Sequence, residues 1–136
     1  MVKPGNTKDK NAKKIVNEIL KSNTQSRIYI FLLKKDGAKT EQIIKGTKLH
    51  PSTVRDALSK MYEQKLINRK KIKNGHIGKN PYIYYAISPL KLLKKYTNEM
   101  ENRLNKLACL TLSKEDRERY RPVKIKISER FVWLCK

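Results

Sequence analysis

Residues 40–58 read TEQIIKGTKLHPSTVRDAL, and this stretch contains two helix starts separated by a turn. Thr40 to Lys45 predicts a short helix, because Glu41 lies near the positive end of the helix dipole. Gly46 to His50 is expected to form the turn. Pro51 suits the first turn of the following helix, where its missing N–H is no loss. The stretch therefore predicts two helices joined by a tight turn.

The helix that begins at Pro51 has one apolar and one polar face. Its apolar residues recur at three- and four-residue steps, as expected for a single buried stripe: Val54, Ala57, Leu58 and Met61. Its outward face carries polar or charged groups able to meet base edges and phosphates in a major groove: Ser52, Thr53, Arg55, Asp56, Ser59 and Lys60. A purely solvated helix surface would have a similar composition. The preceding turn and the following strands favour a recognition helix.

Two runs rich in β-forming residues follow, over residues 66–73 and 82–88. They are expected to pair as antiparallel strands. Gly75 and Gly78 between them permit positive φ, and the loop carries three basic side chains: Lys73, His76 and Lys79. The order of helix, turn, helix and hairpin predicts a winged helix-turn-helix, in a fold that is mainly α with a small β-hairpin wing. The wing is expected to touch the sugar-phosphate backbone or the minor groove.

Three tyrosines in the second run, Tyr82, Tyr84 and Tyr85, allow two interpretations. Such rings stack on bases in proteins that bind single strands. Alternation within a two-stranded sheet packed on helices instead places at least one of them in the core. The second interpretation is favoured.

The charge of the chain points to a polyanionic partner. Its 136 residues include 33 Lys+Arg and 12 Asp+Glu, for a formal net charge of +21. Nine Lys or Arg and no acid lie between Glu63 and Glu99. Such an excess predicts nucleic acid. Side chains expected to neutralise phosphates are Lys60, Arg69, Lys70, Lys71, Lys73 and Lys79.

Several other classes of protein are disfavoured. No apolar run approaches the ~20 residues of a spanning helix, and no apolar segment follows the N-terminus, so a cytoplasmic protein is expected. The isolated Cys109 and Cys135, with two histidines, do not form a zinc cluster. The chain lacks a Gly-rich phosphate loop, paired carboxylates in an apolar setting and a Ser/His/Asp set. We therefore expect no enzymatic activity and no metal or cofactor.

The DNA-binding domain is expected to cover residues 11–88, preceded by a basic arm over residues 1–10 that is disordered or simply a frayed terminus. Within this domain, a helix from Ala12 is interrupted at residues 22–24. A second helix follows, with a core face predicted from three apolar residues: Ile28, Phe31 and Leu32.

A long helix is expected over residues 89–112, opened by Ser88 and Pro89. Its apolar residues suit a seam against another helix: Leu93, Tyr96, Met100, Leu104 and Leu107. A homodimer through this helix is favoured over packing against its own domain. Residues 113–136 form a C-terminal extension, polar at first and then alternating from Val123 to Ile127. Its apolar end at residues 131–135 predicts a terminal strand or a docking segment.

The sequence resembles the archaeal sugar-responsive regulators named TrmB, winged-helix proteins related to the MarR and ArsR families. The resemblance covers roughly residues 24–108 and rests on RIYIFLL at 27–33, TEQI at 40–43, LHPSTVRDAL at 49–58 and LINR at 66–69. It implies that helix 51–64 enters the major groove, that the basic wing 69–82 contacts the backbone, and that the helix after Ser88 dimerises.

The sequence departs from this family in three places. His50 stands where a Ser or Asp helix cap is usual, and Thr40 and Thr47 stand where aliphatic residues are expected. Longer relatives carry a separate sugar-binding domain after the dimerisation helix. Only about 26 residues remain here, so sugar sensing by that route is not expected.

The expected function is a homodimeric, sequence-specific double-stranded DNA-binding transcription regulator, with bases read by Ser52, Thr53 and Arg55. Two alternatives stay open. One is an architectural or chromatin protein that binds DNA without sequence preference. The other is a module that recruits general transcription machinery through residues 131–134. RNA binding is less favoured, because the deep, narrow major groove of A-form RNA excludes a recognition helix.

Overall fold

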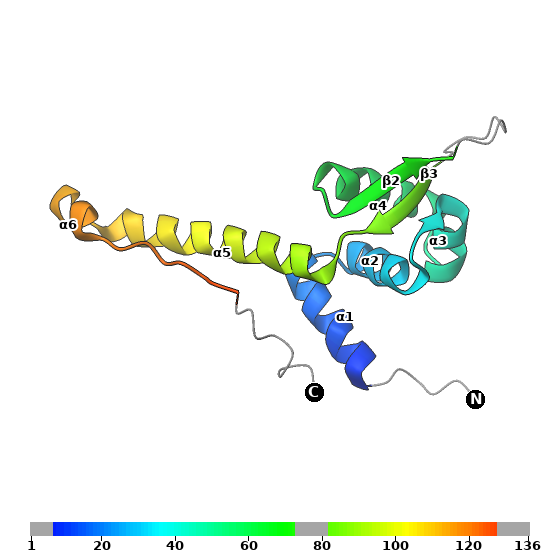
Figure 1. Cartoon of the computed structure of the whole chain (residues 1–136), viewed down its shortest axis with the longest axis horizontal. Helices are drawn as coiled ribbons and strands as arrows, with labels where there is room; N and C mark the ends of the chain where they lie inside the picture. Colours follow the sequence, from blue (N-terminus) through cyan, green and yellow to red (C-terminus); the bar gives the residue numbers. More distant parts are fainter. Residues whose placement is uncertain (1–6, 73–81, 128–136) are drawn as a thin grey trace. The chain divides into compact units, whose positions relative to one another are not determined.

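The computed structural model describes residues 7–72 and 82–127 (Figure 1). The chain divides into two compact units, Met1–Ser88 and Pro89–Lys136. The first unit contains α1 (Thr7–Leu20), α2 (Asn23–Lys35), β1 (Ala38–Lys39), α3 (Thr40–Thr47), α4 (Pro51–Glu63), β2 (Ile67–Lys71) and β3 (Tyr82–Ala86). The second contains α5 (Pro89–Thr111) and α6 (Lys114–Arg119). In the described part of the chain, every helix is too short or too polar to cross a membrane.

The predicted fold class is confirmed, because helices dominate and the strands form one small antiparallel sheet in the order β1-β3-β2. In the hairpin, Ile67 lies opposite Ala86 and Lys71 opposite Tyr82. Strand β1 was not predicted. Its two residues pair with β3, Ala38 lying opposite Tyr84, and so short a segment has no periodicity that a sequence pattern could reveal.

Helix α2 is central to the core of the first unit, where it contacts α1, α3, α4 and β3. Ile28, Tyr29 and Leu32 on this helix are fully buried. Phe31, predicted as a core residue, is only half-buried. The buried stripe follows Ile28, Tyr29 and Leu32 around the helix, and this rotation leaves Phe31 at the edge of the core.

The Tyr29 hydroxyl links α2 to the C-terminal end of the first unit. It donates a hydrogen bond of 2.8 Å to the carbonyl oxygen of Ile87, which follows strand β3. Burial raises the pKa of Tyr29 to about 12. The neutral phenol is therefore the form that the folded protein holds.

We expect alkaline pH to destabilise the protein through this phenol. The pKa of Tyr29 is higher in the folded chain than in the unfolded chain. The contribution of its neutral phenol to the free energy of unfolding is therefore complete below pH 10 and is lost as the pH rises toward 12. The difference corresponds to about 3 kcal/mol. In Tyr29→Phe this component should be absent, and the Ile87 carbonyl left unpaired should cost about 1–3 kcal/mol at pH 7. Urea unfolding at several pH values tests both effects. Parallel alkaline losses in the two proteins would contradict the assignment.

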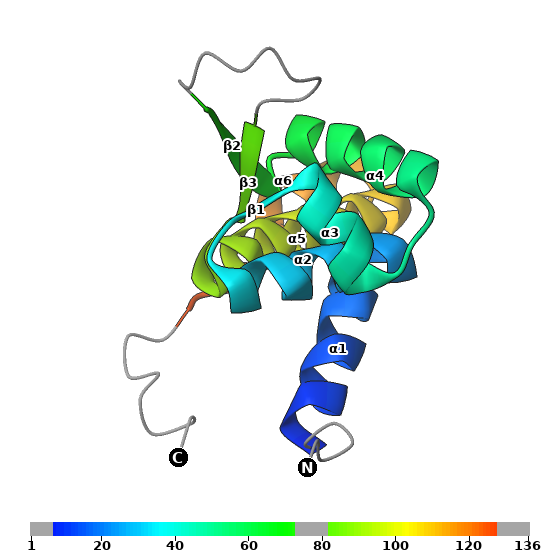
Figure 2. The same ribbon diagram turned by 90° about the vertical axis from the view of Figure 1, so that its right-hand side faces the viewer.

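Helices α3 and α4 form the predicted helix-turn-helix (Figure 2). Helix α3 extends to Thr47, two residues beyond the expected end, so Gly46 is helical and is not part of the turn. Lys48 ends the helix in the left-handed conformation, with φ 58°. The buried Thr47 satisfies its hydroxyl within its own helix, donating to the Ile43 carbonyl at 2.6 Å. Its carbonyl accepts a hydrogen bond from Arg27 Nη2.

Thr40, the other residue found where an aliphatic side chain was expected, is also buried. The basic arm expected over residues 1–10 overlaps a helix, because α1 begins at Thr7. Lys and Asp are tolerated in a helix that continues into an amphipathic segment, so composition alone placed this boundary too late. Residues 1–6 lie outside the described residues.

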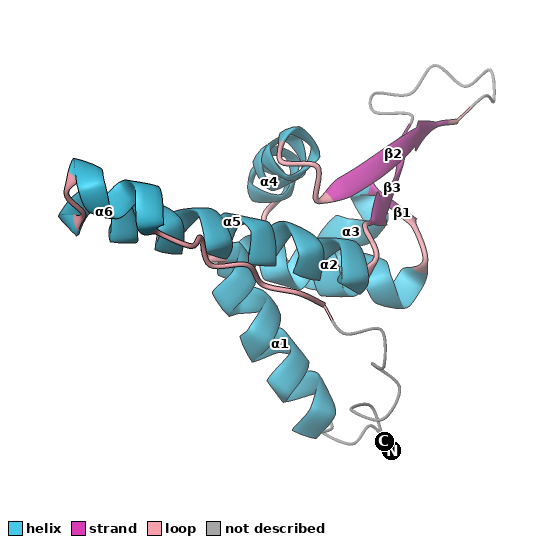
Figure 3. Ribbon diagram, turned by 60° about the vertical axis from the view of Figure 1, so that its left-hand side comes forward, coloured by secondary structure: helices cyan, strands magenta, loops and turns pink. Residues whose placement is uncertain are grey.

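In the second unit, residues 120–127, which we call the strap, run back along α5 (Figure 3). Asn105 binds the strap backbone at both polar groups of one residue: Val123 N–H donates to Oδ1 at 2.7 Å, and Nδ2 donates to Val123 O at 3.2 Å. One turn further along, Ile125 N–H donates to Glu101 Oε2 at 3.1 Å. Two extended residues span about 6.6 Å and one helical turn about 5.4 Å, which explains this spacing.

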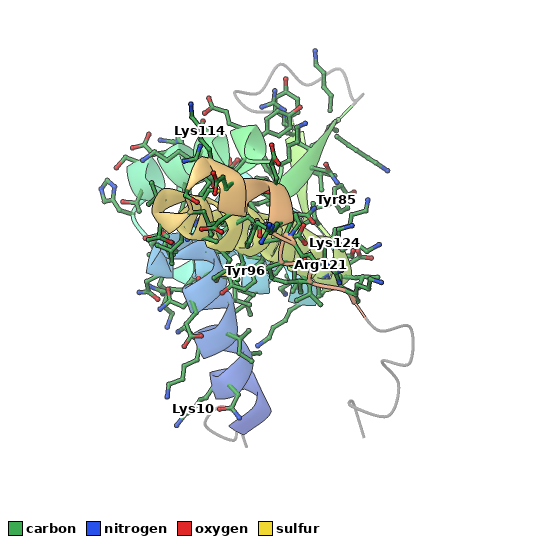
Figure 4. All side chains as sticks on the ribbon, turned by 90° about the vertical axis from the view of Figure 1, so that its left-hand side faces the viewer. Lys10, Tyr85, Tyr96, Lys114, Arg121 and Lys124 are labelled. Atoms are coloured by element: carbon green, nitrogen blue, oxygen red, sulfur yellow. The ribbon has the colours of Figure 1, made fainter. Side chains whose placement is uncertain are left out.

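The C-terminal extension therefore differs from the prediction. Its first part, described from the sequence only as polar, contains helix α6, capped by the Ser113 hydroxyl, which accepts from Asp116 N–H at 3.2 Å. The strap is held by helix side chains and is not part of a sheet. Its basic side chains Arg121 and Lys124 are exposed (Figure 4). The predicted docking segment at residues 131–135 lies outside the described residues.

Replacing Asn105 with Ala is expected to release the strap from α5. The change removes both bonds to Val123 and the bond of 2.8 Å from the Tyr120 hydroxyl. Each such bond contributes about 1 kcal/mol, so hydrogen exchange at the Val123 and Ile125 amides should accelerate about tenfold or more. NMR exchange rates test this. Asn102→Ala on the same helix is the control, because the hydrogen bonds to the strap come from Glu101 and Asn105. Unchanged exchange in Asn105→Ala would refute the role of this side chain.

Candidate nucleic-acid interface

Helix α4 divides into the two faces that its sequence predicts. Val54, Ala57, Leu58 and Met61 are all buried, which confirms the predicted stripe. On the other face the structure exposes five of the predicted contact residues: Ser52, Arg55, Asp56, Ser59 and Lys60. Thr53 is half-buried. The apolar stripe thus fixes the rotation of the helix and determines which side chains meet solvent.

His50 replaces the usual cap at the start of α4. Its Nδ1 accepts a hydrogen bond of 3.3 Å from Ser52 N–H, so the imidazole satisfies one of the free donors at the helix terminus. The Ser52 hydroxyl lies 2.8 Å from the same nitrogen. Ser52 is therefore exposed but engaged with His50, and its hydroxyl is oriented by the helix cap.

The hairpin next to α4 presents a basic strand. Arg69, Lys70 and Lys71 of β2 are all exposed, and β2 contacts α4 directly. Three further predicted wing residues, Lys73, His76 and Lys79, lie outside the described residues.

Arg69 is held between two tyrosine rings from different elements. Its guanidinium carbon lies 4.0 Å from the ring centroid of Tyr62 on α4 and 4.4 Å from that of Tyr82 on β3. Each contact contributes about 0.5–2 kcal/mol. The stack joins the end of α4 to the hairpin, while the planar N–H edges of Arg69 keep their capacity to donate to phosphate.

The tyrosines of β3 pack in the core or contact basic side chains of β2. Tyr84 is buried, as the alternation of the strand predicted. Tyr82 contacts Arg69, and Lys70 Nζ lies 5.6 Å from the ring centroid of Tyr85. The rings therefore position cations of β2. This arrangement does not favour the base-stacking interpretation.

In the second unit, the predicted dimerisation residues lie along α5 with increasing exposure toward its C-terminal half. Leu93, Tyr96 and Met100 are half-buried. Leu104 is 40% and Leu107 63% exposed. The strap binds Glu101 and Asn105, which lie on a different side of the helix from Leu107. The apolar seam therefore retains exposed leucines after the strap is bound.

Sequence reasoning missed the Tyr62–Arg69–Tyr82 stack and the strap. The stack brings together three elements, and no local spacing indicates it. The alternation of Val123, Ile125 and Ile127 did signal an extended segment, but not its partner.

The helix-turn-helix of α3 and α4, followed by the β2–β3 hairpin, defines a winged helix-turn-helix protein. A family model described as sugar-specific transcriptional regulator TrmB matches residues 22–90, just over half of the chain. The chain belongs to the TrmB family, which is a family of transcriptional regulators and not of enzymes.

Solved structures of similar fold include a possible transcriptional regulator from Methanosarcina mazei Go1. It has a TM-score of 0.58 and 20% sequence identity, over 74% of this chain and 88% of that chain. A MepR variant from S. aureus bound to an oligodeoxyribonucleotide has a TM-score of 0.48 and 20% identity, over 81% and 82% of the two chains. The first similarity supports the fold alone. Comparison with curated proteins gave no match.

Proposed function

We propose that the protein is a transcription regulator that binds double-stranded DNA in a sequence-specific manner as a homodimer. The observation that carries the proposal is the exposure of a polar helix face on α4 beside a strand, β2, whose residues 69–71 are all basic. Helix 51–64 would enter the major groove, and the wing 69–82 would follow the sugar-phosphate backbone.

The proposed contacts divide by chemistry. Arg55 would read a guanine edge, with Ser52 and Thr53 nearby, and Asp56 would accept from a cytosine amino group. Residues that would contact phosphates or the groove walls are Ser59, Lys60, Arg69, Lys70, Lys71, Lys73, His76 and Lys79. Because Arg69 is fixed between Tyr62 and Tyr82, it would meet phosphate with little further loss of side-chain entropy.

Dimerisation is proposed through α5. Leu104 and Leu107 are exposed in the single chain and follow Leu93, Tyr96 and Met100 along one seam. Pairing with the same seam of a second copy would remove these side chains from water, in the manner of a two-helix contact. A symmetric dimer reads an inverted repeat.

Selection of fragmented genomic DNA at about 200 mM salt, followed by sequencing, tests the proposal, because such salt suppresses non-specific binding. We expect recovery of a few sites that share an inverted repeat. Even coverage of the genome would instead identify an architectural protein.

Replacing Arg55 with Ala is expected to relax the selected sequence at one position of each half-site. The loss of a bidentate base contact costs about 1–3 kcal/mol, or roughly 5- to 150-fold in affinity. Lys60→Ala is the matched control on the same helix. It should weaken binding to all sequences alike. A uniform loss in Arg55→Ala would count against base reading by this residue.

A further inference from the structure

Two adjoining cavities open on the first unit, away from the elements proposed to contact DNA. The larger has a volume of about 480 Å³ and is lined by residues that include Phe31, Lys35, Gln42, Lys45 and Gly46. The smaller has a volume of about 260 Å³, shares Phe31 and Gly46, and is also lined by Lys13, Arg27, Lys34 and Thr47. Among the described residues, the lining of both comes from α1, α2, β1, α3 and the connection before β1, with none from α4 or the hairpin.

The common wall of the two cavities is the ring of Phe31, which rests on the backbone of α3 at Gly46. A Cβ atom at Gly46 would lie 2.0 Å from Phe31 Cε2 and 2.5 Å from Cζ, so a larger residue requires the ring to move. Glycine within a helix costs about 1 kcal/mol relative to alanine. This close approach explains why glycine occupies position 46: the absence of a Cβ atom leaves room for the half-buried Phe31 ring between the two cavities.

All the charged residues that line the cavities are basic. They are Lys13, Arg27, Lys34, Lys35 and Lys45. Arg27 is oriented by its hydrogen bond to the Thr47 carbonyl. The half-buried ring of Phe31, which lines both cavities, offers stacking to a planar ring, and lysines and arginine offer charge-assisted hydrogen bonds to phosphate. The larger volume lies in the range of small-molecule sites, about 300–1,000 Å³.

We propose that these cavities bind a free nucleoside polyphosphate, with its base against Phe31 and its phosphates near Lys35 and Lys45. An unpaired nucleotide in a nucleic-acid strand shares this chemistry. The position of the cavities on α1, α2 and α3, with no lining residue from the recognition helix or the hairpin, favours the free ligand. Because α3 contacts α4 directly, the ligand would lie on the helix that precedes the recognition helix. The proposal does not depend on DNA binding.

Calorimetric titration of the full chain with ATP, tripolyphosphate and adenosine, at about 150 mM salt with a chelator, tests the site. Tripolyphosphate has the charge without the ring, and adenosine has the ring without the charge. We expect ATP to bind about tenfold more tightly than tripolyphosphate, because stacking adds to the ionic contacts. Equal affinity for ATP and tripolyphosphate would overturn the proposal.

Variants assign the binding to the cavities. Lys35→Gln with Lys45→Gln should weaken ATP binding at least about tenfold. Gly46→Ala should do so without any change in charge, because it displaces the Phe31 ring. Circular dichroism monitors folding of each variant. Lys70→Gln with Lys71→Gln removes the same charge from the hairpin and should leave ATP binding unchanged.

An equal loss of ATP binding in the hairpin variant would overturn the proposal, because it would indicate general attraction to a basic protein. Displacement of ATP by a dT oligonucleotide at a lower nucleotide concentration would also overturn it, by assigning the cavities to a nucleic-acid strand.

Discussion

Replacing Leu104 and Leu107 with Glu is expected to convert the proposed dimer into a monomer and to reduce affinity for the selected DNA site at least about 100-fold. These side chains are 40% and 63% exposed in the single chain. Burial of a leucine contributes about 1.5–3 kcal/mol, and a two-fold dimer would bury each one twice. A carboxylate without a partner at the same place opposes association by several kcal/mol.

The loss of DNA affinity follows from the loss of the second half-site. When two DNA-binding domains are joined in a dimer, the second binds its half-site at a high effective concentration, which raises overall affinity by roughly 10²–10⁴. A monomer has no such gain. Sedimentation equilibrium measures the oligomeric state, and fluorescence anisotropy with an inverted repeat measures the affinity.

Asn102→Glu is the matched control, because Asn102 is exposed and lies on nearly the opposite side of α5 from Leu104 and Leu107. It adds the same charge and should leave a dimer. A double variant that remains dimeric would show that the seam of α5 is not the contact. A monomer that binds DNA as tightly as the parent would show instead that dimerisation does not contribute to affinity.

Local periodicity explains which parts of the fold the sequence could predict. The stripe of Val54, Ala57, Leu58 and Met61 is buried as expected, because an amphipathic helix has one way to turn its apolar face inward. The exposed polar face of α4 follows from the same rotation. Composition likewise predicted the basic character of β2.

The features that were missed depend on contacts between distant residues. Asn105 and Val123 are 18 positions apart, and nothing in their local sequence indicates that an amide on a helix will bind an extended backbone. The place of Arg69 depends on Tyr62 and Tyr82, which belong to different elements. Gly46 was expected in the turn but belongs to α3. The Phe31 ring leaves no room for a Cβ atom there, a constraint that only the tertiary structure reveals.

Raising the salt concentration from 50 to 200 mM is expected to weaken DNA binding by roughly 10³ or more, if about six phosphates are neutralised per subunit. The exposed cations on α4 and β2 that would account for this include Lys60, Arg69, Lys70 and Lys71. Each neutralised phosphate contributes about −0.9 to the slope of log K against log salt. Titrations at five or more salt concentrations give this slope.

Lys70→Gln with Lys71→Gln should make the slope less steep by about 1.8 per subunit, because two ionic contacts are removed. Glu41→Gln changes charge on α3, outside the proposed interface, and should leave the slope unchanged. A slope that does not change in the hairpin variant would exclude β2 from the phosphate contacts.

Since Tyr62 and Tyr82 fix Arg69 beside these lysines, Tyr62→Ala should weaken DNA binding. The slope should stay nearly the same, because the charge of Arg69 remains and only its position is lost.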